Sequence, residues 1–244
     1  MAGFWGLLRE SADSVCHHEW RQRKHMAKIR DTKGRDEGGS GYVRLLGNEE
    51  LGVLLSKTHA TVIRNGNELE HLIAERCPFR CSGLEQRLAV GPVEILGGGG
   101  RPEPEVYFSE RIAIPGHARR IASDIVLLRN SLHGAAVIEL KDGDTFDTKK
   151  AQGELESMST LADWIATAMG YEVSMHFCCF NQQDKTAIIV GTKGRFTPEQ
   201  VLTGRELCQW LCVDYAEVQR QREEDAKDNY NYFVSEVFRI VGME

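Results

Sequence analysis

No apolar run in this 244-residue sequence approaches the roughly 20 residues that a helix needs to cross a membrane. The first residues lack the positively charged and long apolar regions of a secretory signal peptide. Seven cysteines are present, and an odd number does not suggest a framework of disulfides. Free thiols in a reducing compartment are the simplest interpretation. We therefore expect a cytoplasmic protein without a membrane span.

Two common kinds of ligand-binding motif are also missing. Cys77 and Cys81 are spaced like a pair of zinc ligands, as are Cys208 and Cys212. The second pair falls within a helical pattern and is better interpreted as small core residues. The glycines at 97–100 are not followed by Lys-Ser/Thr and the start of a helix, as a phosphate-binding loop requires. We expect neither a zinc site nor a nucleotide site.

An excess of positive charge is absent as well, since the formal net charge is −6. Taken alone, this argues weakly against a nucleic-acid partner, but binding depends on where the basic groups lie. Seven basic residues crowd the stretch 21–35. This run is either a solvated helix face or a surface that contacts phosphates.

Hydrophobic residues make up 41% of the chain and charged residues 27%, which is ordinary for a globular protein. Helical periodicity is found over residues 3–30, 48–56, 66–77 and 155–169, and again from 203 to the end. Short apolar runs predict strands over 105–114, 123–128, 135–141, 171–180 and 186–191. This order predicts one α/β domain with a central mixed sheet flanked by helices. Its parts are a helical arm (1–58), a core (60–195) and C-terminal helices (196–244).

One cluster of charged residues lies on two neighbouring predicted strands. Alternation along a strand puts Glu139 and Lys141 on one face, while Leu140 points to the other. Asp124 opens the preceding strand, so its carboxylate and that of Glu139 converge if the two strands are neighbours. Two buried carboxylates beside a lysine are costly unless a divalent cation lies between them. Magnesium prefers such oxygen ligands.

Asp124, a gap of fourteen residues and then Glu139-x-Lys141 resemble the PD-(D/E)xK nuclease superfamily, and more narrowly type II restriction endonucleases. The first strand has Ser-Asp where the motif has Pro-Asp. The resemblance covers roughly residues 60–195, which would form a restriction-endonuclease-like catalytic core. It implies hydrolysis of double-stranded DNA at a short specific sequence by a homodimer, leaving 5′-phosphates. Its cofactor would be Mg²⁺, for which Mn²⁺ can substitute, held by Asp124, Glu139 and Leu140.

The resemblance also implies an acidic residue on an early helix that supports the metal site. Glu70 fits this role because it borders the apolar stripe of the helix predicted over 66–77. Glu68 and Glu75 are alternatives. Lys141 would orient the attacking water, deprotonate it, or neutralise the charge that develops in the reaction.

Four basic residues are candidates for DNA contacts. Lys149 and Lys150 follow the motif and could bind phosphates, which position DNA without reading its sequence. Arg119 and Arg120, with His117, come just before the Asp124 strand. They are the best-placed residues for reaching phosphates or base edges, since arginine favours guanine.

Plainer interpretations stay open at this point. Asp124 could be a strand-start residue that binds backbone amides, and Glu139 with Lys141 an ordinary surface ion pair. Glu70 could be a solvated helix residue. A structure-specific repair or recombination nuclease of the same fold, or a DNA-binding protein without catalysis, are the alternative functions. The apolar residues of the last helix, among them Tyr230, fit either a core or a dimer interface.

Overall fold

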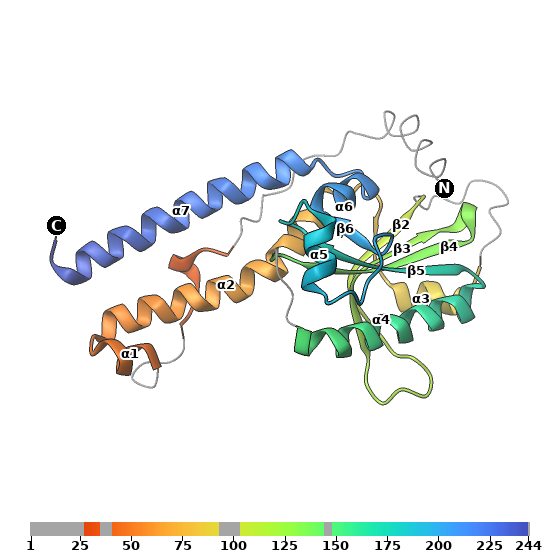
Figure 1. Ribbon diagram of the computed structural model, residues 1–244, viewed down its shortest axis with the longest axis horizontal. Helices are drawn as coiled ribbons and strands as arrows, with labels where there is room; N and C mark the ends of the chain where they lie inside the picture. The colour runs from red at the N-terminus through yellow and green to blue at the C-terminus, as the bar shows by residue number, and fades with distance from the viewer. Residues whose placement is uncertain (1–26, 35–40, 93–102, 144–147, 244) are drawn as a thin grey trace.

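The computed structural model describes residues 27–34, 41–92, 103–143 and 148–243 (Figure 1). Most of the helix predicted over 3–30 lies outside the described residues, as do the basic residues from 21 to 26 and the glycines at 97–100. A short 3-10 helix, η3 (Ile29–Asp31), is the first described element.

A six-stranded mixed sheet forms the centre of the molecule, in the spatial order β1-β2-β3-β4-β5-β6. β2, β3 and β4 are antiparallel neighbours, whereas β1 runs parallel to β2, and β5 and β6 continue parallel to β4. The strands are β1 (Arg80–Cys81), β2 (Glu105–Ile112), β3 (Ile121–Arg129), β4 (Gly134–Lys141), β5 (Glu172–Cys179) and β6 (Val201–Thr203). The predicted mixed sheet is confirmed, including the pairing of the two strands that contain Asp124 and Glu139.

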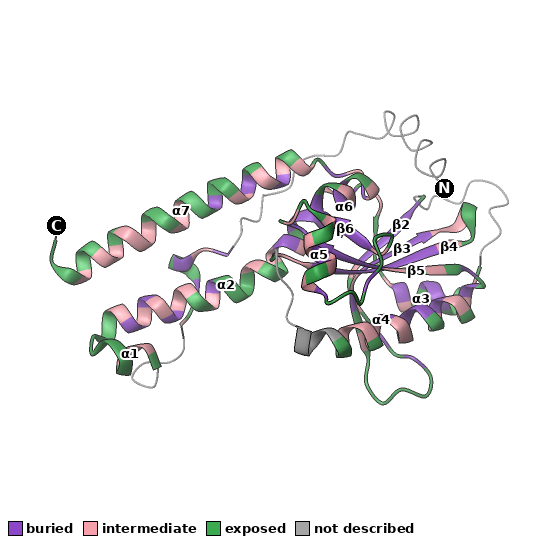
Figure 2. Ribbon diagram, viewed as in Figure 1, coloured by how far each residue is buried: buried purple, intermediate pink, exposed green. Residues whose placement is uncertain are grey.

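Helices cover both faces of this sheet (Figure 1). On one face, α2 (Glu49–Arg76), α6 (Gly204–Trp210) and the start of α7 (Tyr215–Val241) bury apolar side chains against the odd-numbered residues of β3. On the other face, α3 (Leu84–Val90) and α4 (Thr148–Met169) bury theirs against the even-numbered residues. The sheet is buried throughout its centre (Figure 2). Among the described helices, none is long and apolar enough to span a membrane.

One element was predicted as two. Separate helices were expected over 48–56 and 66–77, but α2 runs without a break through 28 residues. Asn48 caps its start by accepting a hydrogen bond from the Leu51 amide at 2.9 Å. The middle of α2 has left the sheet and has no core to pack against, so it needs no apolar stripe. Val62, for example, is 67% exposed there. The periodicity that reveals a buried helix is therefore absent from this stretch.

The half of α2 that leaves the sheet belongs to an extended pair of helices, which we call the arm from here on. It differs from the helical arm predicted over 1–58, because α7 forms the other half of it. In Figure 1, α2 and the long α7 run side by side away from the sheet, and α1 (Gly41–Leu46) packs on α2. At the end of the arm away from the sheet, an ion pair of 2.9 Å between Arg239 of α7 and Glu50 of α2 joins the two helices. Much of the outer half of α7 is exposed or half-buried (Figure 2), including Tyr230 at 67%.

The strand predicted over 186–191 is wrong, because these residues form a helix, α5 (Lys185–Gly191). Its β-branched residues suggested a strand. The local chemistry favours a helix instead, since the Asp184 side chain accepts a hydrogen bond from the Thr186 amide at 2.8 Å and caps the first turn. The place beside β5 is taken by the three residues of β6, which the sequence pattern did not reveal.

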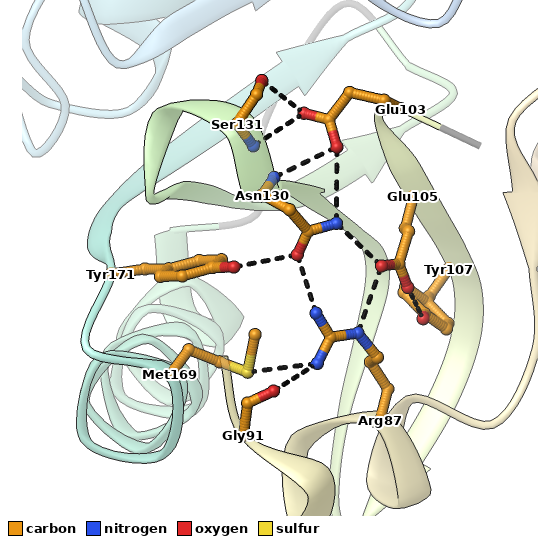
Figure 3. A network of polar contacts seen from close by, with 9 residues as sticks. All are labelled: Arg87, Gly91, Glu103, Glu105, Tyr107, Asn130, Ser131, Met169 and Tyr171. Atoms are coloured by element: carbon orange, nitrogen blue, oxygen red, sulfur yellow. Dashed lines mark hydrogen bonds and ion pairs between the residues drawn. The ribbon is translucent and has the colours of Figure 1, made fainter. Parts of the chain in front are cut away.

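A buried polar network fixes one end of the sheet (Figure 3). Arg87 from α3 donates to Glu105 at 3.1 Å and to Asn130 at 2.7 Å, and its side chain is only 2% exposed. Asn130 also donates to Glu105 at 2.8 Å and accepts from the Tyr171 hydroxyl at 2.9 Å. The network joins the start of β2 to the end of β3, at the sheet end opposite to Asp124. It anchors the scaffold away from the candidate site.

Candidate active site

Asp124, Glu139 and Lys141 lie together at one end of the sheet. β3 and β4 are in register with Ile125 opposite Ile138, so the next residues outward are Asp124 and Glu139. Even-numbered side chains of β3 and odd-numbered side chains of β4 face α4, so Asp124, Glu139 and Lys141 lie on that face of the sheet. Leu140 packs on the opposite face, against α2. The structure therefore brings the three predicted residues onto one face, as strand alternation requires.

Hydrogen bonding holds Asp124 against the end of β4. Its Oδ2 accepts a hydrogen bond from the Leu140 amide at 2.7 Å, just beyond the last registered pair of the β3–β4 ladder. A strand residue directs its amide and its carbonyl to the same side. The Leu140 carbonyl therefore also points toward the side of Asp124, and it is the only group through which Leu140 could bind a metal.

Lys141 is held between two carboxylates. Its Nζ donates to Glu139, and it donates to Glu154 Oε1 at 2.9 Å. Glu154 comes from α4 and was not among the predicted site residues. A signal for it exists in the sequence: Glu154 lies four residues before buried Met158 and seven before buried Leu161, where the apolar stripe of α4 would otherwise continue.

Glu70 reaches the same end of the sheet from α2. It accepts a hydrogen bond from the hydroxyl of Ser109, a residue of β2. The β2–β3 register runs from Phe108 opposite Ile125 to Glu110 opposite Ser123 and omits Ser109, whose φ of 51° is left-handed. This local distortion lies beside Asp124. Of the two alternatives to Glu70, Glu75 is exposed to solvent.

The acidic groups of the site affect one another strongly. Burial, together with the charges of Glu70 and Glu154, raises the pKa of Asp124 to about 6. Burial and the charge of Asp124 raise the pKa of Glu139 to about 7. Burial alone would lower the pKa of Lys141, but the carboxylates of Glu139 and Glu154 raise it well above its ordinary value. The lysine is thus firmly protonated, and the carboxylates are crowded in a way that a cation would relieve.

The donor set fits a hard divalent cation. Asp124, Glu139 and the Leu140 carbonyl offer oxygen atoms alone, and magnesium usually takes one or two carboxylates with water and phosphate oxygens. In the described part of the chain, no three His, Cys, Asp or Glu side chains are grouped closely enough to hold a metal by themselves. The expected site depends on a main-chain oxygen and therefore differs from such a cluster.

The predicted DNA-contact residues fall at the same end of the molecule. Arg119 and Arg120 lie in the connection between β2 and β3, which emerges from the end of the sheet that carries Asp124. Both are exposed, and Arg120 forms an ion pair with Glu85 and donates to the Arg111 carbonyl. Lys149 and Lys150 lie in the first turn of α4, and their side chains are outside the described residues.

Comparison with known proteins identifies the family of this chain. The chain is 40% identical over 222 residues to the type II restriction enzyme HhaII of Haemophilus parahaemolyticus, an alignment that covers 88% of this chain and 95% of that enzyme. No family model matches the sequence, and no solved structure matches it. Identity at this level across nearly the whole of both chains shows the family: the chain belongs to the type II restriction enzymes.

Proposed function

We propose that this restriction endonuclease is a magnesium-dependent member of the PD-(D/E)xK superfamily with a restriction-endonuclease-like fold. It hydrolyses double-stranded DNA at a short specific sequence and leaves 5′-phosphates. The observation that carries the proposal is the meeting of Asp124, Glu139 and Lys141 at one sheet end, in a chain that aligns with a type II restriction enzyme over 88% of its length.

Asp124, Glu139 and the Leu140 carbonyl would hold the cation, with Glu70 supporting the site from α2. The carboxylates have raised pKa values and lie against a buried sheet end, so a cation gains more from binding them there than in water. When bound, Mg²⁺ or Mn²⁺ supplies Lewis acidity toward the scissile phosphate and lowers the pKa of a nearby water.

Lys141 acts on the substrate as a cation and a hydrogen-bond donor. The raised pKa keeps its amine protonated, which makes it a poor base at neutral pH. Two of its three N–H groups point to Glu139 and Glu154, and the third can orient the attacking water or neutralise charge on the phosphate. The water attacks phosphorus in line and the 3′-oxygen leaves, which gives a 5′-phosphate and a 3′-hydroxyl.

We further propose that the enzyme acts as a homodimer. A duplex has two strands, and one site in each of two symmetry-related subunits would cut both at a palindromic sequence. The arm offers apolar surface for such an interface, since Tyr230 is 67% and Phe238 47% exposed on α7.

A digest of unmethylated phage DNA tests the proposed function. The purified protein is incubated with Mg²⁺, with Mn²⁺ and with EDTA. We expect discrete bands in the first two reactions and intact DNA in the third. Intact DNA under all conditions, on several unmethylated templates, would contradict the proposal. Cleavage that depends on junctions, ends or mismatches would favour the structure-specific alternative.

A further inference from the structure

Glu154 is a carboxylate on the core-facing side of a helix. It shares one face of α4 with Met158 and Leu161, which are 3% and 1% exposed and pack on the sheet. α4 itself packs on both β4 and β5. The position of α4 is therefore fixed relative to the strand that carries Lys141.

The contacts of Glu154 are incomplete. Its Oε1 accepts the ion-paired hydrogen bond from Lys141 at 2.9 Å. Its Oε2 is buried and, among the described residues, has no hydrogen-bond partner. A buried acceptor without a partner is destabilising, because it has lost its hydrogen bonds to water without replacing them. A residue chosen for stability alone would be expected to continue the apolar stripe of α4 at this position.

We propose that Glu154 is a positioning residue for Lys141. The lysine side chain is a flexible four-carbon stem with an ammonium that rotates freely, so one carboxylate does not fix the direction of its remaining N–H. Glu139 lies on the same strand as Lys141, and Glu154 reaches the ammonium group from α4, which packs on that strand. Two carboxylates from different elements hold two donors and direct the third into the site. This inference rests on the proposed function, because it assigns Glu154 to the same reaction.

A purely structural role predicts different behaviour. If Glu154 only ties α4 to β4, its loss would lower stability and would affect DNA binding and cleavage together. If Glu154 positions Lys141, its loss slows the chemical step while DNA still binds. Residues that orient the ligands of a metal site typically contribute 10- to 100-fold to activity, and by analogy a slowing of about that size is expected for a residue that orients Lys141.

The test compares Glu154→Gln, which keeps the shape, with Glu154→Asp and with the control Glu156→Gln. Glu156 is an exposed residue of the same helix, and its carboxylate accepts a hydrogen bond from the Gln152 side chain at 2.8 Å. Single-turnover cleavage and the Kd for DNA in EDTA are measured for each protein, with thermal unfolding to check the fold. We expect Glu154→Gln to slow cleavage about 10- to 100-fold with Kd changed less than about 2-fold. Asp should recover part of the rate, and the control should match the wild type.

A spectroscopic readout is independent of activity. In protein with isotope-labelled lysine, the Lys141 ammonium signal is identified by its loss in Lys141→Met. We expect this signal in the wild type and in Glu156→Gln, and its loss through faster exchange with water in Glu154→Gln. Wild-type cleavage rates or an unchanged Lys141 signal in Glu154→Gln would overturn the inference. If the wild type cleaves no DNA at all, the proposed function fails, and the role of Glu154 in that reaction fails with it.

Discussion

Replacing Glu139 by glutamine is expected to stabilise the metal-free protein at neutral and alkaline pH while it abolishes cleavage. Glu139 is 9% exposed and lies beside Asp124, and burial followed by the Asp124 charge raises the pKa of its carboxylate to about 7. Glutamine has nearly the same shape and carries no charge. It therefore removes the repulsion that the ionised carboxylate causes in the folded state.

The magnitude follows from the size of the pKa difference. An ordinary glutamate has a pKa of 4.5, and each unit of difference corresponds to about 1.4 kcal/mol. Ionised Glu139 thus lowers the free energy of unfolding by on the order of 3 kcal/mol once the pH exceeds about 7. The folded state binds this proton more tightly than the unfolded state. The wild type is consequently most stable relative to the variant below pH 4.5, and it loses stability as the pH rises through about 7.

Thermal unfolding in EDTA at pH 4, 6 and 8 measures the effect. For a chain of this size, about 3 kcal/mol corresponds to a rise in Tm of roughly 6–12 °C at pH 8, and the two proteins should converge near pH 4. Glu156→Gln is the matched control, with no pH-dependent difference expected. Adding Mg²⁺ at pH 8 should raise the Tm of the wild type more than that of Glu139→Gln. A Glu139→Gln protein that is less stable than the wild type at pH 8 in EDTA would show that ionised Glu139 does not destabilise the metal-free fold.

Three further changes test other parts of the structure. Arg87→Met leaves Glu105 buried without its cation and should lower the free energy of unfolding by about 3–5 kcal/mol, as measured by urea titration. A loss below about 1 kcal/mol would contradict a stabilising role for the network. Gly204→Ala would place a Cβ 2.3 Å from the Phe180 carbonyl oxygen, so a loss of about 1–3 kcal/mol or more is expected, and unchanged stability in the same titration would exclude that close approach. Arg119→Ala should weaken DNA binding and reduce the salt dependence of log K by about one unit if this arginine contacts a phosphate; an unchanged slope would remove it from the interface.

The centre of the site could be predicted because it depends on local geometry. Alternation along β4 alone puts Glu139 and Lys141 on one face, and a short connection between two apolar runs makes their strands neighbours. Asp124 then follows from the register. The start of the helical region at 203 is equally local, because Thr203 and Glu206 form a capping box there with reciprocal hydrogen bonds of 3.3 Å and 2.9 Å.

What the sequence could not supply depends on tertiary packing. The sequence marks Glu154 as a charged residue in line with the apolar stripe of α4, but its place beside Lys141 depends on the packing of α4 across β4. Ser109 contacts Glu70 beside a distortion of β2 next to Asp124. α5 shows the same limit, since β-branched residues form a helix where a cap and tertiary packing favour it. The continuity of α2 was hidden because its middle section buries no stripe.

Cleavage of unmethylated DNA by the wild type, Asp124→Asn and Lys141→Ala, with Glu156→Gln as the control, tests the assignment of the active site. All four proteins are assayed with Mg²⁺ and with EDTA, and their folding is checked by thermal unfolding. We expect the same discrete Mg²⁺-dependent bands for the wild type and the control, and intact DNA for the two site variants although they fold. Cleavage at the wild-type rate by either folded site variant would contradict the claim that Asp124, Glu139 and Lys141 form the active site.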